Sequence, residues 1–385
     1  MRKVYLDHNA TTPVRKEVLD AMRPYFADES GNASSVHSKG QAANKAVESS
    51  REIIGNAIGT ESVDIVFTSG GTEADNFAIK GIAMANLEKG RHIITTEIEH
   101  LAVLEPCRFV EEELGFEVTR IGVDKYGMVD MDRLKDSIRK DTVLISVMFA
   151  NNETGTIHPI REISGLAKRH GIYFHTDAVQ ALGKEPVDVD GMGIDLGSFS
   201  AHKLGGPKGV GGLYIRKGVK IMPFQHGGHH ERSRRAGTLN VPGIVGFAKA
   251  VEIAAKDMRK VNRHLKKLTK RFLDSLHKEL DEIYLNGHPE NRLSNTLNVS
   301  FRYIEGESLL LNFDLKGIFA STGSACTSGS LEPSHVLTAM KVPPDISQGS
   351  IRFSFGYENT EEDVDYCLTE IPPIVKRLRE MSPLC

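Results

Sequence analysis

Short apolar runs separated by helical stretches place the strongest constraint on the fold of this chain. The run at 143–148 has no charged residue and is typical of a strand buried on both faces. Further strands are predicted at 65–68, 92–96, 172–177, 196–200 and 212–216, and a helix at 72–86. Strands that alternate with helical stretches indicate an α/β fold with a largely parallel sheet.

The pattern changes after Pro242. Residues 244–280 carry apolar side chains at helical spacing among many charged ones, which predicts a long amphipathic helix. Alternating segments at 297–301 and 350–355 then predict the strands of a smaller α+β domain. The 385 residues exceed what one core usually holds, so two domains are expected. We predict a large domain at 14–257 and a small one made of 1–13 and 258–385.

The net charge and the cysteine content restrict the kinds of binding partner and the cellular compartment that we expect for this chain. With 48 basic and 51 acidic residues the net charge is −3, so no overall field favours nucleic acid or a membrane surface. No apolar run approaches the roughly 20 residues that span a bilayer, and Asp7 interrupts any signal peptide. The four cysteines are far apart and form no C-x-x-C pair, which favours a reducing cytoplasm over a disulfide framework.

A glycine-rich turn lies between the first predicted strand and the helix that follows it. In Thr68-Ser69-Gly70-Gly71-Thr72-Glu73 the glycines allow close backbone approach, and the helix start leaves N–H groups available to an anion. A plain turn with a capping threonine explains this segment equally well. Taken alone, the turn leaves both interpretations open.

Two polar residues follow later predicted strands. Asp177 ends the strand at 172–177, where a carboxylate could pair with a protonated pyridine nitrogen, although a helix cap is the commoner role. Lys203 follows the strand at 196–200 and suits a Schiff base beside a phosphate site, although an isolated loop lysine is usually solvated. The glycines after Lys203 match neither G-x-x-x-x-G-K-[ST] nor G-x-G-x-x-G, which excludes these nucleotide sites.

Cys326 differs from the other cysteines in its surroundings. Small polar residues and glycines flank it over 321–329, which is typical of an accessible loop thiol. Cys107 and Cys367 lie in helical patterns and fit buried, inert residues, and Cys385 is terminal. Cys326 is therefore the candidate nucleophile.

Together these segments resemble the cysteine desulfurases of the NifS/IscS type, which are pyridoxal-phosphate (PLP) enzymes of the class-V aminotransferase-like group. The likeness also includes the segments at 5–13, 31–37, 95–100, 150–155, 237–240 and 350–354. It implies the fold type I PLP-dependent transferase fold, with a mostly parallel seven-stranded sheet in the large domain and a smaller α+β domain. Ala33 and Gly71 depart from it, since proline and alanine are usual there.

The resemblance implies a role for each matching residue. Lys203 would bond to PLP, His100 would stack on the ring and move protons, and Cys326 would receive sulfur from L-cysteine as a persulfide, releasing L-alanine. Thr238 would reach the phosphate in the partner subunit, which requires a homodimer. The other cofactor contacts would be Asp177 at the ring nitrogen, Gln180 at the phenolic oxygen, Asn152, and Gly71, Thr72, Ser200 and His202 at the phosphate. The substrate carboxylate would be held by Asn32, Asn152 and Arg352.

Several alternatives remain open on the sequence. An iron–sulfur scaffold protein is the implied sulfur acceptor, and Cys326 is a candidate transient cluster ligand. A selenocysteine lyase or an aminotransferase would share the scaffold, and a non-catalytic scaffold protein is an alternative of another class. We expect no resident metal, because His226, His229 and His230 lack firm ligand spacing and are typical of a surface turn.

Overall fold

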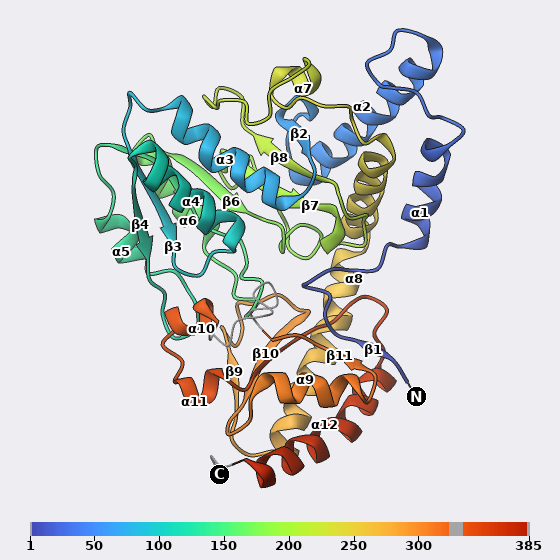
Figure 1. The fold of residues 1–385 in the computed structure, drawn as a ribbon, viewed down its shortest axis with the longest axis vertical. Helices are drawn as coiled ribbons and strands as arrows, with labels where there is room; N and C mark the ends of the chain where they lie inside the picture. Colours follow the sequence, from blue (N-terminus) through green and yellow to red (C-terminus); the bar gives the residue numbers. More distant parts are fainter. Residues whose placement is uncertain (1, 323–333, 383–385) are drawn as a thin grey trace.

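A seven-stranded mixed sheet forms the upper part of the molecule in Figure 1. The computed structural model describes residues 2–322 and 334–382. β8 is antiparallel to both of its neighbours, and the other adjacent pairs are parallel. The order across the sheet is β2 (Ile65–Thr68), β8 (Gly211–Ile215), β7 (Leu196–Ser200), β6 (Tyr173–Asp177), β5 (Thr142–Ser146), β3 (His92–Thr96) and β4 (Glu117–Ile121).

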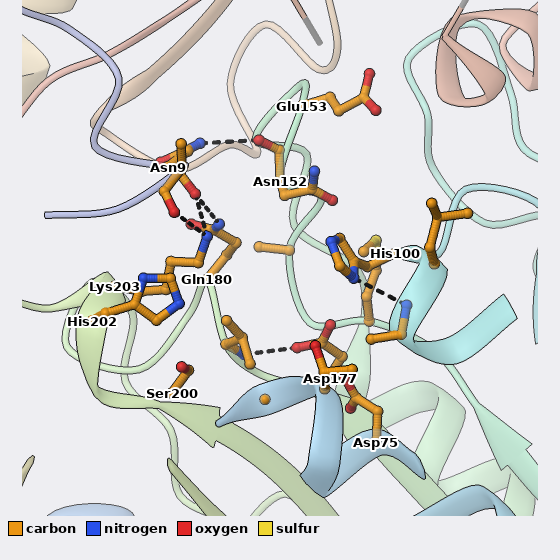
Figure 2. Close-up of a pocket in the computed structure, with 18 of the residues that line it drawn as sticks. Asn9, Asp75, His100, Asn152, Glu153, Asp177, Gln180, Ser200, His202 and Lys203 are labelled. Atoms are coloured by element: carbon orange, nitrogen blue, oxygen red, sulfur yellow. Dashed lines mark hydrogen bonds between the residues drawn. The ribbon is translucent and has the colours of Figure 1, made fainter. Parts of the chain in front are cut away.

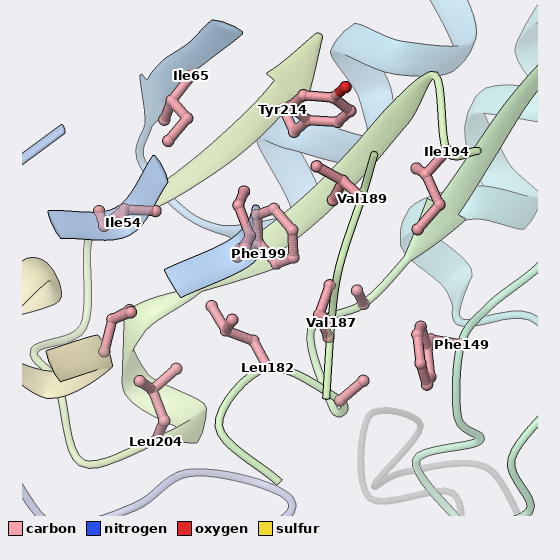
Figure 3. Close-up of a cluster of buried hydrophobic side chains, with 14 of the residues drawn as sticks. Ile54, Ile65, Phe149, Leu182, Val187, Val189, Ile194, Phe199, Leu204 and Tyr214 are labelled. Atoms are coloured by element: carbon pink, nitrogen blue, oxygen red, sulfur yellow. The ribbon is translucent and has the colours of Figure 1, made fainter. Parts of the chain in front are cut away.

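Helices cover both faces of this sheet, since its strands are apolar on both sides. Phe67 and Ile65 point into one core together with α2 (Ser38–Ile58), α6 (Ile160–Arg169) and the first part of α8 (Val241–Glu279). Figure 3 shows part of this core around Phe199. Val66 points the opposite way, toward α3 (Gly71–Ala85) and α4 (Leu101–Leu114). The other elements here are α1 (Lys16–Met22), η1 (Arg23–Phe26), η2 (Ser62–Asp64), α5 (Met131–Asp136), η3 (Ala201–Lys203) and α7 (His230–Ser233).

Helix α8 connects two hydrophobic cores. Its early residues belong to the core on one face of the large sheet. Its later residues, from Leu265 to Leu276, belong to a second core. That core contains the antiparallel sheet β12 (Ser350–Ser354), β10 (Thr296–Phe301) and β9 (Ile283–Asn286). It also contains residues of α9 (Gly306–Asp314) and α12 (Glu361–Met381). Near it lie α10 (His335–Ala339) and α11 (Pro344–Ser347).

The N-terminal segment joins the C-terminal part of the chain. Strand β1 (Val4–Tyr5) pairs in parallel with β11 (Ile318–Phe319), as the blue strand beside the orange and red elements in Figure 1 indicates. Residues 9 and 10, which follow it, reach the carboxyl ends of β6 and β7, where they contact Gln180 and Lys203. The domain limits at 13/14 and 257/258 remain a prediction.

The predicted fold class is confirmed, including the mostly parallel seven-stranded sheet, and the strands predicted at 297–301 and 350–355 pair with each other as β10 and β12. The strands predicted at 65–68, 92–96 and 196–200 have the predicted bounds, and the ends of the others differ by one or two residues, as in β5, which ends at Ser146. β4 was not predicted, since Glu117 and Arg120 interrupt the apolar pattern of this edge strand. In the described part of the chain, no helix combines the length and apolar character that crossing a membrane requires.

Candidate active site

A cavity of about 340 Å³ lies at the carboxyl ends of β6 and β7, and Figure 2 shows its lining. Most of the predicted site residues line it, although they come from distant segments: Gly71, Thr72, His100, Asn152, Asp177, Gln180, Ser200, His202, Lys203 and Arg352. Asn32 and Thr238 are exposed and do not line the cavity of this chain. Cys326 lies outside the described residues.

Lys203 enters the cavity from the short turn after β7. Its Nζ donates hydrogen bonds to the backbone oxygens of Asn9, at 2.5 Å, and Ala10, at 2.9 Å. The amine therefore contacts the N-terminal segment, as Figure 2 shows. A primary amine held in a cavity is the group that forms a Schiff base with a carbonyl compound.

The start of α3 forms one wall of the cavity. N–H groups in the first turn of a helix have no acceptor within the helix, so the backbone near Gly71 and Thr72 suits an anion. A Cβ on Gly71 would lie 2.7 Å from Cγ2 of Val179, so the backbone at Gly71 packs directly against the Val179 side chain. Ser200 and His202 add side-chain donors, and burial, with the charge of Lys203, lowers the pKa of His202 to about 4. This donor set fits a phosphate group.

Two carboxyl groups lie at the floor of the cavity. Asp177 ends β6, and its Oδ1 accepts the N–H of Val179 at 2.9 Å. Burial raises the pKa of Asp177, so a cationic partner in the cavity would favour its ionised form. Asp75 lies beside it in Figure 2, and burial together with the charge of Asp177 raises its pKa. Two adjacent buried carboxyls do not both ionise readily, so we expect Asp75 to keep its proton.

His100 lies at the start of α4 and is neutral at ordinary pH. Burial, with the charges of Lys203, His335 and Arg352, lowers its pKa to about 4. Its Nδ1 accepts the backbone N–H of Ala102 at 3.1 Å, so the ring proton is on Nε2. The neutral ring can therefore offer a flat face and an N–H donor.

Arg352 is buried on the polar face of the smaller sheet. Its neighbours Ile351 and Phe353 enter the second core, so alternation along β12 directs Arg352 the other way. Nη2 lies 2.8 Å from Oδ1 of Asp7, and Nη1 donates to the backbone oxygen of Asn152 at 3.2 Å. Nε is buried and has no hydrogen bond within the described chain. This guanidinium keeps donor capacity for a carboxylate in the cavity.

The comparisons with known proteins place this geometry in a family. The family model for class-V aminotransferases matches residues 4–367. The chain is 58% identical to the cysteine desulfurase IscS of Methanosarcina thermophila, over 100% of this chain and 94% of the relative. The chain belongs to the class-V aminotransferase family. The predicted resemblance to NifS/IscS-type proteins is thereby confirmed.

Solved structures agree with this class-V aminotransferase assignment. A NifS-like protein superposes with a TM-score of 0.93 at 41% identity, covering 98% of this chain and 100% of that structure. The structure of SspA in complex with cysteine has a TM-score of 0.82 at 36% identity, covering 93% and 100%. The family is PLP-dependent, and the amine, phosphate-type donor set and buried carboxylate described above fit that cofactor.

Several lining residues of this class-V aminotransferase were not predicted as site residues. Asn9 is buried and contacts Lys203, but its motif was used only for the resemblance. Asp75 lies within the predicted helix at 72–86 and was not singled out there, although a buried position for an acid is unusual enough to signal a site. His335 also lines the cavity, and its Nε2 lies 2.9 Å from the backbone oxygen of Glu99.

Cys107, Cys367 and the histidines at 229–230 do not line this cavity. Cys107 and Cys367 are buried, as predicted, and burial raises the pKa of both thiols. His229 contacts the hydroxyl of Ser233, and His230 accepts the N–H of Gly237. Within residues 2–322 and 334–382, no group of three or more His, Cys, Asp or Glu is arranged to hold a metal ion.

Proposed function

We propose that this class-V aminotransferase is a cysteine desulfurase that removes sulfur from L-cysteine and forms L-alanine. The observation that carries the proposal is one cavity that combines the Lys203 amine, the buried Asp177, the start of α3 and the buried Arg352. The names of relatives over the full chain, such as the IscS protein of Methanosarcina thermophila, support the same activity. The related SspA structure in complex with cysteine supports cysteine as the substrate.

The residues of the cavity would hold PLP in a fixed orientation. Gly71, Thr72, Ser200 and His202 would bind its phosphate, and Asp177 would keep the ring nitrogen protonated. Lys203 would bond to the cofactor before substrate enters. Bound there, PLP supplies an electron-poor ring that stabilises negative charge on the substrate.

The substrate would be oriented by its carboxylate. Arg352 would bind this group through its guanidinium, with the side-chain amide of Asn152 as a further donor. Lys203, released when substrate binds, would move the proton at the substrate Cα. His100 would lie against the ring and provide its Nε2 proton. Asn32, which is exposed here, would contribute only after local rearrangement or from the partner subunit.

Cys326 would accept the sulfur atom. Its thiolate would attack the substrate sulfur, so that an S–S bond forms while the substrate Cβ–S bond breaks and leaves its electron pair on the carbon, which takes up a proton to give alanine. An acceptor such as an iron–sulfur scaffold protein would then take the outer sulfur of the persulfide. Thr238 is exposed, which suits a contact with the phosphate in the partner subunit of a homodimer. The histidine-rich turn at 229–230 lies eight residues before Thr238 in the sequence.

The test is the fate of sulfur and alanine in matched cysteine variants. Purified protein loaded with PLP is incubated with cysteine, alanine is quantified, and the intact mass shows whether one sulfur atom has been added. Cys326→Ala should lose both products and keep the absorbance of the bound cofactor, whereas Cys385→Ala should behave as wild type. Undiminished alanine formation by Cys326→Ala would refute the persulfide role. Transfer of the amino group of added alanine to an added 2-oxo acid, with pyruvate as the product, would instead favour an aminotransferase.

A further inference from the structure

Lys184 lies behind the cavity and contacts it through another side chain. Its Nζ donates to Oε1 of Gln180 at 2.8 Å and lies 3.4 Å from Oδ1 of Asn9. Gln180 in turn donates from Nε2 to the backbone oxygen of Asn9 at 3.0 Å. That oxygen also accepts the hydrogen bond from Lys203. Figure 2 shows Gln180 and Lys203 converging on Asn9.

The local backbone sets Lys184 beside Gln180. The N–H groups of Leu182 and Glu185 bond to carbonyls four residues earlier, so the segment after β6 turns like a helix. Gly183, with a φ of 78°, ends this turn in the left-handed conformation, and the hydrogen bond from Lys184 to Gln180 closes it. The backbone oxygen of Lys184 is also fixed, because it accepts a hydrogen bond from Asn262 of α8 at 2.6 Å.

The two neighbours of Gln180 dictate the same orientation of its amide. A lysine ammonium only donates, so it requires the amide oxygen on its side. The backbone oxygen of Asn9 only accepts, so it requires the amide nitrogen. Rotating the amide by half a turn would break both hydrogen bonds. One N–H of Gln180 then remains for a ligand in the cavity that this residue lines.

We propose that Lys184 is a positioning residue that locks the side-chain amide of Gln180, so that Gln180 presents an N–H donor to an anionic oxygen of the bound cofactor. The inference deepens the proposed function and rests on it, since it concerns PLP at this site. Lys184 does not line the cavity itself, and its hydrogen bond to Gln180 is shorter than its contact with Asn9, so we expect it to act mainly through Gln180.

The burial of Lys184 and the positive charges near it make a lysine at this position unfavourable for folding, unless the lysine has a function. Burial, together with the charges of Lys203 and Arg352, lowers the pKa of Lys184 to about 7. Asn9 and Asn295 meet at the same point, since Nδ2 of Asn295 donates to Oδ1 of Asn9 at 3.1 Å. The side-chain amides of Gln180 and Asn9 that contact the Lys184 amine carry no charge. An apolar side chain in place of Lys184 would avoid the free-energy cost of burying an amine.

The experiment is a double-mutant cycle read by cofactor binding and spectrum. Lys184→Met, Gln180→Ala and the double variant are loaded with PLP, and the absorbance maximum and dissociation constant of PLP are measured. A lost donor to a charged oxygen should weaken PLP binding by about tenfold. Lys184→Met should shift both readouts in the same direction as Gln180→Ala. In the Gln180→Ala background, Lys184→Met should have no further effect.

Control variants keep the test decisive. Lys184→Gln retains a donor toward Oε1 of Gln180, so it should restore most of the wild-type spectrum. Lys89→Met removes a lysine that donates to the backbone oxygen of Gly171 away from the cavity, and it should change neither readout. Additive effects of Lys184→Met and Gln180→Ala would overturn the inference. A wild-type protein that does not bind PLP at all would instead refute the proposed function.

Discussion

The buried ion pair of Arg51 and Glu231 supports the segment that leads to Thr238. Nη1 and Nη2 of Arg51 contact the two carboxylate oxygens of Glu231 at 2.7 and 2.8 Å. Oε2 of Glu231 also accepts the backbone N–H of Phe67 on β2 at 2.7 Å. The side chains are only 2% and 1% exposed. The pair therefore joins α2, β2 and the turn at 230–233 in a single buried contact.

The size of the effect of Glu231→Ala follows from these contacts. Removing one partner of a buried ion pair costs about 3–5 kcal/mol, because a charge stays buried. Glu48, at 38% side-chain exposure, remains 3.1 Å from Arg51 and compensates in part. Since Glu48 offsets part of the cost of the unpaired charge, we expect a net loss at the lower end of this range, about 3 kcal/mol.

Urea unfolding followed by far-UV circular dichroism measures this loss, since the chain has no tryptophan for fluorescence. Glu48→Ala is the matched control and should cost less than about 1 kcal/mol, because its carboxylate is partly exposed. The double variant Arg51→Met with Glu231→Met should recover most of the loss, since no buried charge remains. A Glu231→Ala variant within about 1 kcal/mol of wild type would refute the reasoning.

Two further predictions concern the cavity, and a third concerns the buried carboxyl group of Glu99. Gly71→Ala should weaken PLP binding severalfold in equilibrium titrations, because its Cβ would meet Val179 at 2.7 Å, and Val179→Ala should restore the affinity; a lack of rescue would contradict the steric argument. Arg352→Lys should raise KM for cysteine by about 10- to 100-fold with a smaller change in kcat, since the lysine loses the bidentate grip, and steady-state alanine formation tests this; an unchanged KM would exclude the carboxylate contact. Burial raises the pKa of Glu99 from 4.5 to about 8, so the folded state holds a proton that the unfolded chain releases, and stability should fall as pH rises from about 4.5 to 8. Urea titrations of Glu99→Gln should show a shallower fall over that range, and parallel curves would argue against a protonated Glu99.

The sequence was sufficient to predict the fold class because its hydrophobic pattern directly reflects which residues are buried. Strands apolar on both sides must lie inside a sheet covered on two faces, and the observed cores around Phe67 and Val66 satisfy this requirement. The long helix at 244–280 was also predictable, and α8 spans Val241–Glu279. The edge strand β4 was not predictable, since its partly exposed, charged residues carry no clear period.

The site was predictable only where residue type and position after a strand were informative. Lys203 and Asp177 follow strands, and the parallel arrangement brings those strand ends together. Asp75, Asn9 and Lys184 do not follow a predicted strand in this way, and the contacts that give them a role, with Asp177, Lys203 and Gln180 respectively, exist only in the folded chain. Nothing in the sequence distinguishes Lys184 from a solvated lysine.

The residues alone therefore determined the alternation of elements, the sheet type and the chemical groups available for catalysis. The tertiary structure decided which groups meet, how Gln180 is oriented and which acids retain a proton. The physical reason is that hydrophobic periodicity is a local property of the chain, whereas pKa shifts and hydrogen-bond orientation depend on burial and on charges brought close by folding.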